Sequence, residues 1–284
     1  MVVADLPARS KVGGITGNRT SSKGCARCLF DMDDLGTSNA SSSVNRTRAH
    51  REQSLACSTR DGANRYKELG VSYASFNELP YFATPLMCPP DHMHAIHLGL
   101  CKRFFHTFLI EACGNLRGHL EKLLKVINKA RLPSRAKRPD HRIGRPSGGN
   151  PNAEQWVTLF RHQLLFGLID IWKDVLGGTG SLQLSFHPES KSSRRPVLEG
   201  EKPVDDIFEA AVLLAAIVDY MENDFTESKV QRLEVLITTF NRQQANLLGP
   251  GWLTINSHIA EHIPEFIKRY GARKYRFETH TNDA

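Results

Sequence analysis

The chain lacks the features that mark several large classes of protein. Its 284 residues contain no run of about 18 apolar residues, so the sequence predicts no transmembrane helix. The segment Met1–Ile15 has no basic start followed by a long apolar stretch, so a secretory signal is not expected. Six cysteines are too few for a small, disulfide-rich secreted scaffold. The sequence therefore predicts a reduced, intracellular compartment and no membrane partner.

Acidic residues are scarce in the first half of the chain. Residues 1–152 contain 23 Lys and Arg against 12 Asp and Glu, whereas residues 153–284 contain 14 against 18. The formal net charge of +7 therefore comes from the first half. A basic half beside an acidic half predicts a polyanion bound to one face. A basic surface without any partner would give the same composition.

Helical periodicity dominates the sequence, and no internal repeat is visible. The apolar spacing predicts helices over residues 91–114, 116–132, 153–176, 204–222, 226–246 and 256–270. The intervening residues 133–152 and 178–203 are rich in Gly, Pro or basic residues and predict loops. Residues 31–66 are polar and predict a long, partly disordered loop. The short segment before Asp5 is apolar and predicts the end of a strand.

Two pairs of metal-ligand residues stand far apart in the sequence. Cys25 and Cys28 form a Cys-x2-Cys turn, which can chelate one zinc ion. His258 and His262 are four residues apart on a predicted helix, so both lie on one face, as chelation requires. Together the two pairs would form a Cys2His2 site. Separately, the cysteines could be an ordinary or redox-active thiol pair, and the histidines a partly buried stripe.

The histidine pair also matches a catalytic motif. His258, Glu261 and His262 have the spacing of the inverted zinc-protease motif. That motif needs a third protein ligand well downstream, and only 22 residues follow His262. The protease interpretation is therefore disfavoured.

Asp91 precedes a helix that carries His92, His94 and His97. An acid that follows two prolines is well placed to cap a helix N-terminus. In one interpretation Asp91 is only a cap and His97 packs in the core. In the other, His92 or His94 faces an active site or a phosphate group.

Three acids near the ends of the chain are candidate ligands for catalytic metal ions. Asp5 follows the predicted strand, a position where a rigid scaffold can present a carboxylate, and Glu278 and Asp283 lie near the last residue. Carboxylates of this kind hold Mg²⁺ for phosphoryl transfer. The sequence contains no Walker loop, no dinucleotide-binding glycine pattern and no nucleophile elbow.

Several stretches, taken in order, resemble transposases of the CACTA (En/Spm) group that are widespread in fungal genomes. Residues 5–14 resemble the segment D-x-P-A-x-x-K-x-x-G, and the Cys-x2-Cys follows it. Residues 91–102 resemble the block D-x-M-H-x-x-x-L-G-L-x-K. Residues 143–156 resemble a loop followed by an A-[DE]-Q-W helix, and residues 258–271 resemble a His-x3-His helix with its following glycine. The series covers nearly the whole chain.

The resemblance implies a mainly α fold in which a helical insertion region is attached to a partial ribonuclease-H-like α/β core, truncated at both ends. Residues 1–30 would be the partial core strand and helix with the Cys pair, and residues 31–67 the polar loop. Residues 68–247 would be the helical insertion, and residues 248–284 the last helix and acidic tail. The resemblance also implies one structural Zn²⁺ in the Cys2His2 site, similar to that of the V(D)J recombinase catalytic subunit.

The resemblance further implies DNA strand cleavage and transfer through two Mg²⁺ or Mn²⁺ ions held by three acids. Asp5 lies 20 residues before Cys25 and resembles the second acid, while Glu278 or Asp283 resembles the third. The strand with the first acid would precede the chain. His94 would touch the scissile phosphate. We therefore expect a fragment of a transposase that lacks cleavage activity.

The implied partner is double-stranded DNA at transposon ends, in the nucleus, with a homo-oligomer possible. Residues 131–145 contain six Arg or Lys and one Asp. The side chains expected to contact backbone phosphates are Arg135, Lys137, Arg138, Arg142 and Arg145. The competing function is a non-enzymatic, zinc-stapled helical interaction module, which would be a domesticated or decayed remnant.

Overall fold

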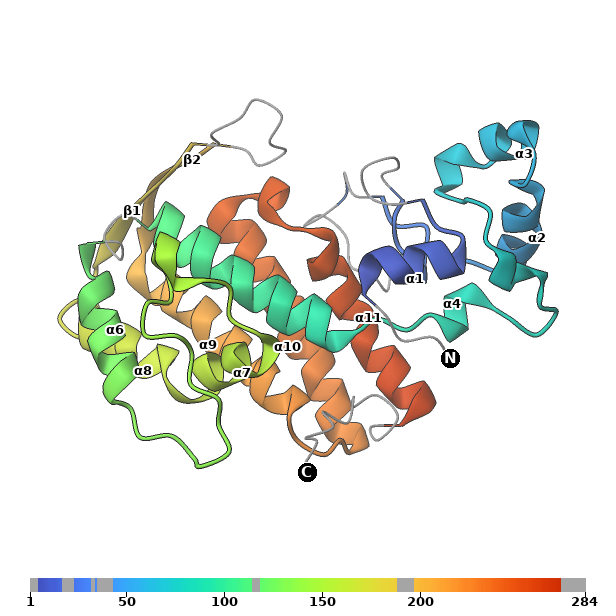
Figure 1. The fold of residues 1–284 in the computed structure, drawn as a ribbon. Helices are drawn as coiled ribbons and strands as arrows, with labels where there is room; N and C mark the ends of the chain where they lie inside the picture. The colour runs from blue at the N-terminus through green and yellow to red at the C-terminus, as the bar shows by residue number, and fades with distance from the viewer. Residues whose placement is uncertain are drawn as a thin grey trace.

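The computed structural model describes residues 5–16, 23–31, 34, 43–113, 118–187 and 197–271. The fold is mainly helical, as the sequence predicts. An N-terminal lobe of short helices (residues 5–90) lies beside a larger helical body (residues 91–271), and helix α11 (Ile255–Tyr270) runs next to the lobe (Figure 1).

The N-terminal lobe is built from short helices around little apolar core. Its apolar cluster contains only four fully buried side chains: Ile15, Ala26, Phe82 and Cys88. The helices are α1 (Leu6–Gly13), α2 (Ala49–Ala56), α3 (Arg60–Arg65), α4 (Thr84–Met87) and the 3₁₀ turns η3 (Lys67–Leu69) and η4 (Ser75–Glu78).

Buried hydrogen bonds hold these short helices together. The carbonyl of Gly13 accepts a hydrogen bond from Thr84 Oγ1 (3.0 Å) and lies 2.7 Å from His50 Nε2. Asn77 Nδ2 donates to Ser54 Oγ over 2.9 Å. Burial lowers the pKa of His50 to about 4, so the ring is neutral and carries its proton on Nε2. The end of α1 is thereby fastened to α2, η4 and α4.

Helices α2 and α3 correct the prediction that residues 31–66 are irregular. The buried side chains of α2 are polar, His50 and Ser54, so no apolar periodicity marks the helix in the sequence. Thr59 caps α3, because its Oγ1 accepts a hydrogen bond from Gly62 N at 3.1 Å. Residues 32–33 and 35–42 of the predicted loop lie outside the described residues.

A long apolar helix crosses the helical body. Its two parts, η5 (Met93–Cys101) and η6 (Phe104–Ala112), are π-helical, with hydrogen bonds from residue i to residue i+5. Large apolar side chains such as Ile96, Phe104 and Phe108 are buried along it. The predicted helix over 91–114 is confirmed, although its winding differs from the expected α-helix.

The predicted helix over 153–176 is divided at Gln163 into α7 (Ala153–His162) and α8 (Leu164–Trp172). Gln163 is buried, and its φ of −133° leaves the helical region. Its side-chain amide donates to the carbonyl of Ile127 in α6 (Leu120–Lys129), over 2.7 Å. The break therefore satisfies a buried carbonyl and lets α8 pack on α6.

Three long helices complete the body. Helices α9 (Val204–Met221), α10 (Glu227–Leu248) and α11 begin and end close to the predicted residues. Helix α10 packs on both α9 and α11, and the 3₁₀ turn η8 (Pro250–Trp252) links α10 to α11. A large apolar cluster joins them to η5 and η6. Within the described residues, no helix is both long and apolar enough to cross a membrane.

An antiparallel hairpin corrects the prediction of a loop over 178–203. Strand β1 (Ser181–Phe186) pairs with β2 (Leu198–Pro203), in a register that places Ser181 opposite Pro203. Leu182 and Leu184 are buried and alternate with exposed residues, a period-two signal that the Gly-, Ser- and Arg-rich surroundings hide. This is the only sheet among the described residues, and the strand predicted before Asp5 falls outside them.

Gly99 allows η5 to approach the start of α11 closely. A Cβ at this position would lie 2.6 Å from Asn256 Nδ2 and 2.8 Å from the carbonyl oxygen of His94. We expect Gly99→Ala to lower the free energy of unfolding by about 1–3 kcal/mol, because the added methyl group would overpack this contact. Urea denaturation measures the change. The matched control is Gly118→Ala, whose Cβ would meet nothing within 4 Å. Equal effects of the two substitutions would contradict the close approach.

Candidate functional site

Cys25, Cys28, His258 and His262 converge, as their spacing predicts. One ligand atom from each residue lies within 4.8 Å of all the others. Cys28 Sγ is 3.2 Å from His258 Nε2 and 3.4 Å from His262 Nε2, and the two Nε2 atoms are 3.2 Å apart. Ligands about 2.0–2.3 Å from a tetrahedral zinc ion are roughly 3.3–3.8 Å from one another. This Cys2His2 cluster is therefore positioned to bind a metal ion such as zinc.

A tight turn presents the two cysteines. The backbone N–H of Arg27 donates to Cys25 Sγ over 3.3 Å, which turns the chain around the sulfur. Cys28 forms an antiparallel bridge with Asn45. The buried Arg46 donates its Nε to the carbonyl of Cys25 at 2.7 Å. The turn is therefore fixed by the bridge to Asn45 and by the side chain of Arg46.

Helix α11 presents the two histidines, and contacts on both sides of the cluster orient the cysteine turn against it. The ring of Phe30 stacks on the imidazole of His258, with centroids 4.0 Å apart and planes at 14°. The guanidinium of Arg27 makes two hydrogen bonds to the carboxylate of Glu265, at 2.8 and 2.6 Å. Glu265 lies three residues after His262, so the same helix carries both contacts.

The electrostatics of the cluster favour a bound cation. Burial disfavours charge on Cys25, but hydrogen bonding from Cys28 and the two nearby imidazoles hold the pKa of Cys25 well below its usual value. The pKa of Cys28 is raised, because its thiol is hydrogen-bonded to Cys25 and because it is buried. A divalent cation would stabilise both thiolates at once, since a coordinated thiol is deprotonated.

The ligand geometry fits a structural role better than a hydrolytic one. All four ligands are buried, and they complete a set of four. Structural zinc sites have four protein ligands, whereas catalytic sites leave one position open to water or substrate. Glu261 would be the catalytic acid of the inverted protease motif, but its Oε1 accepts a hydrogen bond from Asn241 at 2.8 Å.

The structure describes only one of the three acids predicted for the two-metal site. Asp5 lies at the start of α1, where its Oδ1 accepts a hydrogen bond from Ala8 N at 2.9 Å. Glu278 and Asp283 lie outside the described residues. Within those residues, the Cys2His2 cluster is the only group of three or more His, Cys, Asp or Glu that could hold a metal ion. A catalytic role for Asp5 remains a prediction.

Asp91 caps the start of the helix and also contacts one of the histidines, while a role of His94 at an active site remains a prediction. Its Oδ1 accepts a hydrogen bond from Met93 N at 2.9 Å, and its Oδ2 lies 2.5 Å from His94 Nδ1. The side chain of Asp91 is 4% exposed and that of His94 is 39% exposed. Asp91 therefore orients an imidazole whose Nε2 remains available to a partner. His97, in contrast, is buried, and burial together with His92 lowers its pKa to about 3.

The five cations predicted to contact DNA have different surroundings. Arg138 donates to the carbonyls of Ile127, Asn128 and Ala130 at the end of α6 and satisfies carbonyl groups that lack a helical partner. Three others form ion pairs at the surface: Lys137 with Glu154, Arg142 with Asp140, and Arg145 with Glu121. Arg135 is exposed and has no ionic partner among the described residues.

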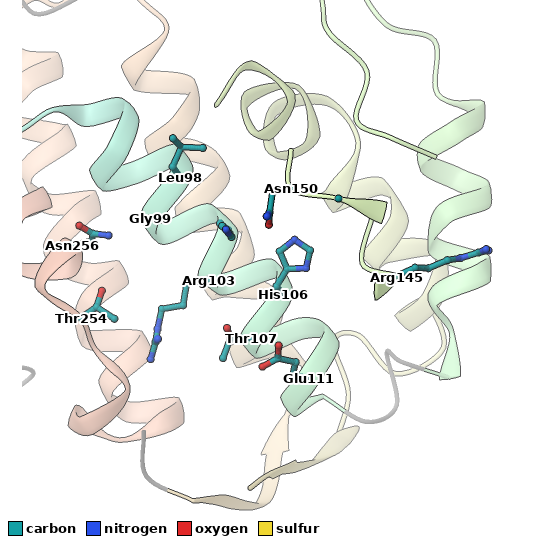
Figure 2. A pocket seen from close by; sticks show the side chains of 12 residues that line it. Leu98, Gly99, Arg103, His106, Thr107, Glu111, Arg145, Asn150, Thr254 and Asn256 are labelled. Atoms are coloured by element: carbon teal, nitrogen blue, oxygen red, sulfur yellow. The ribbon is translucent and has the colours of Figure 1, made fainter. Parts of the chain in front are cut away.

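Sequence analysis missed a polar cavity of about 630 Å³ that lies along η5 and η6. Its lining includes Lys102, Arg103 and His106 from this helix, Asn150 from the loop after η7 (Pro146–Gly148), and Thr254 and Asn256 at the start of α11 (Figure 2). Lys102 belongs to the L-G-L-x-K block, but the facing residues come from distant segments. No local pattern could have revealed the cavity.

Comparisons with protein-family models, with curated protein sequences and with solved structures find no match to this chain. The assignment of a function therefore depends on the residues of the chain itself.

Metal analysis tests the Cys2His2 cluster directly. We expect the purified protein to contain one zinc ion per chain by mass spectrometry of the metal. Cys28→Ser should lose most of this metal and lower the thermal midpoint, because structural zinc contributes on the order of 10 kcal/mol to folding in small domains. Metal content should also fall as the pH is lowered, since protons compete for thiolate and imidazole ligands.

The matched control is Cys57→Ser. Cys57 is a buried thiol outside the cluster, and it donates to the carbonyls of Gly62 and Val71, which a serine hydroxyl can replace. This variant should keep the full metal content. Equal metal content in the Cys28 and Cys57 variants would contradict the assignment of the ligands.

Proposed function

We propose that this chain is a transposase-derived DNA-binding domain whose fold is held together by a structural zinc ion. The convergence of the two ligand pairs carries the proposal. Cys28 and His258 are 230 positions apart, yet their ligand atoms are 3.2 Å apart. A site shared between these two segments is what the resemblance to CACTA transposases implies.

Zinc is the metal that best fits this set of ligands. Two thiolates and two imidazoles in a closed arrangement are typical of structural zinc sites. Cys25 and Cys28 would bind through Sγ, and His258 and His262 through Nε2. When bound, the ion neutralises the buried thiolates and crosslinks the cysteine turn to α11.

In this proposal residues 1–30 are what the chain retains of a ribonuclease-H-like core. Asp5 would be one acid of the two-metal site, and cleavage would also need Glu278 or Asp283 around Mg²⁺ or Mn²⁺. His94, oriented by Asp91, would present Nε2 to a phosphate. We propose that the chain binds DNA without cleaving it.

A salt titration tests DNA binding through the basic loop. Binding to a duplex of roughly 20 base pairs should weaken steeply with salt, because each phosphate contact releases condensed counterions. Replacing both Arg135 and Lys137 by Ala should weaken binding and lower the salt slope by up to about 1.8 units. The exposed ion pair between Lys137 and Glu154 contributes little to folding, so the variant should remain folded. Fluorescence anisotropy measures both quantities.

The control for that experiment removes the same charge elsewhere. Lys229 and Arg232 are exposed on α10 and lie outside residues 131–145. Replacing both by Ala should leave the affinity and the slope close to those of the wild type. Similar losses in the two double variants would mean that the loop contributes only through net charge. Arg138→Ala is unsuitable, because Arg138 supports the end of α6.

A second function, the non-enzymatic interaction module, is favoured by one observation on α8. Phe166 is 65% exposed and Ile169 is 43% exposed, and residues three apart share a helix face. An apolar face of this kind suits a partner protein. A zinc-loaded wild-type chain that fails to bind duplex DNA at low salt would favour this function over DNA binding.

A further inference from the structure

We propose that the cavity along η5 and η6 binds the phosphodiester backbone of a nucleic acid, with Lys102 as its central cation. The inference rests on the proposed DNA-binding function and deepens it, because it places the backbone in a particular cavity outside the basic loop.

One side of the helix that contains η5 and η6 carries a polar stripe that lines the cavity. Its polar residues recur about one turn apart: Lys102 is followed by His106, and Arg103 by Thr107 and Glu111. Lys102 and Arg103 lie between the two π-helical segments. The cavity therefore extends along both π-helical segments, and most of its floor is polar.

Lys102 supplies a positive charge that the described residues do not neutralise. It is half-buried, and no described carboxylate forms an ion pair with it. Two contacts with Trp252 orient Arg103. Its guanidinium donates to the Trp252 carbonyl at 2.5 Å, and its Cζ lies 5.7 Å from the centroid of the Trp252 indole ring. Arg145 pairs with Glu121, and Figure 2 shows it extending away from His106. Lys102 is therefore the cation best placed to receive an external anion.

Neutral donors and the carboxylate of Glu111 share the cavity with this charge. Asn150 points toward His106 from the opposite side of the cavity, and Thr254 and Asn256 lie on the α11 side (Figure 2). The Nε2 atom of His106 is buried and has no hydrogen-bond partner among the described residues. Burial and the charge of Lys102 lower the pKa of His106, so the ring is neutral. Lysine, amide and hydroxyl donors of this kind are those that proteins use to position phosphates.

The shape of the cavity favours a polymer over a single small anion. Its lining runs from Leu98 to Glu111 along the helix, and it includes Arg145, the last cation of the basic loop. A backbone in the cavity would therefore continue toward residues 131–145. Gly149 also lines the cavity, and the absence of its side chain allows a close approach.

Paired lysine substitutions test the site. Lys102→Ala should weaken binding of a duplex and lower the salt slope by about one unit, the loss of one phosphate contact. The matched control is Lys125→Ala, which removes the same charge from an exposed position on α6 outside the cavity. It should leave the slope unchanged. Equal slopes for the two variants would overturn the proposal.

A second measurement uses the unmodified protein, so that misfolding of a variant cannot affect it. Surface lysines are acetylated in the presence and absence of saturating duplex, and the modified positions are quantified by mass spectrometry. We expect DNA to protect Lys102 several-fold and to leave Lys125 equally reactive. If the wild type binds DNA but Lys102 is not protected, this site is wrong while the proposed function stands. If the wild type does not bind DNA, both are wrong.

Discussion

The contact between the cysteine turn and α11 is the constraint on which the rest of the structure depends. Among its described residues, the apolar cluster of the N-terminal lobe contains four buried side chains, so this core is small. Its attachment to the body instead uses the Cys2His2 cluster, the ion pair between Arg27 and Glu265, and a hydrogen bond from the Tyr270 hydroxyl to the carbonyl of Leu86. In such a lobe, the free energy of metal binding is largely free energy of folding.

Helix α11 connects this metal centre to the proposed phosphate site. Its buried face carries His258 and His262, and its first turn places Asn256 against Gly99 at the wall of the cavity. The helix of 16 residues moves largely as one rigid unit. A metal ion that holds His258 and His262 would therefore also limit the movement of Asn256. Metal binding and binding of the backbone are thereby expected to be coupled, although no metal ligand contacts the cavity.

The features that the sequence predicted well have local signals. The Cys and His pairs are recognisable because chelation fixes their spacing, and α9 and α10 because apolar stripes repeat along them. Helix α2 was missed because its buried residues are His50 and Ser54, and the hairpin because only Leu182 and Leu184 mark its alternation. The cavity could not be predicted, since its walls meet only in the folded chain. The ribonuclease-H-like strand expected before Asp5 remains a prediction.

The basic composition of the first half predicts a positive electrostatic potential around the protein. It does not by itself locate the surface that binds a polyanion. Arg46 and Arg138 donate to backbone carbonyls and Arg142 pairs with an acid, so these guanidinium groups support the fold. Their charge still contributes to the long-range attraction of a polyanion. Direct contact is easiest for cations that the protein leaves without an acidic partner, and Lys102 and Arg135 are two such cations among the described residues. A count of arginines in a segment therefore overstates its contacts with phosphate, because some of the arginines support the fold.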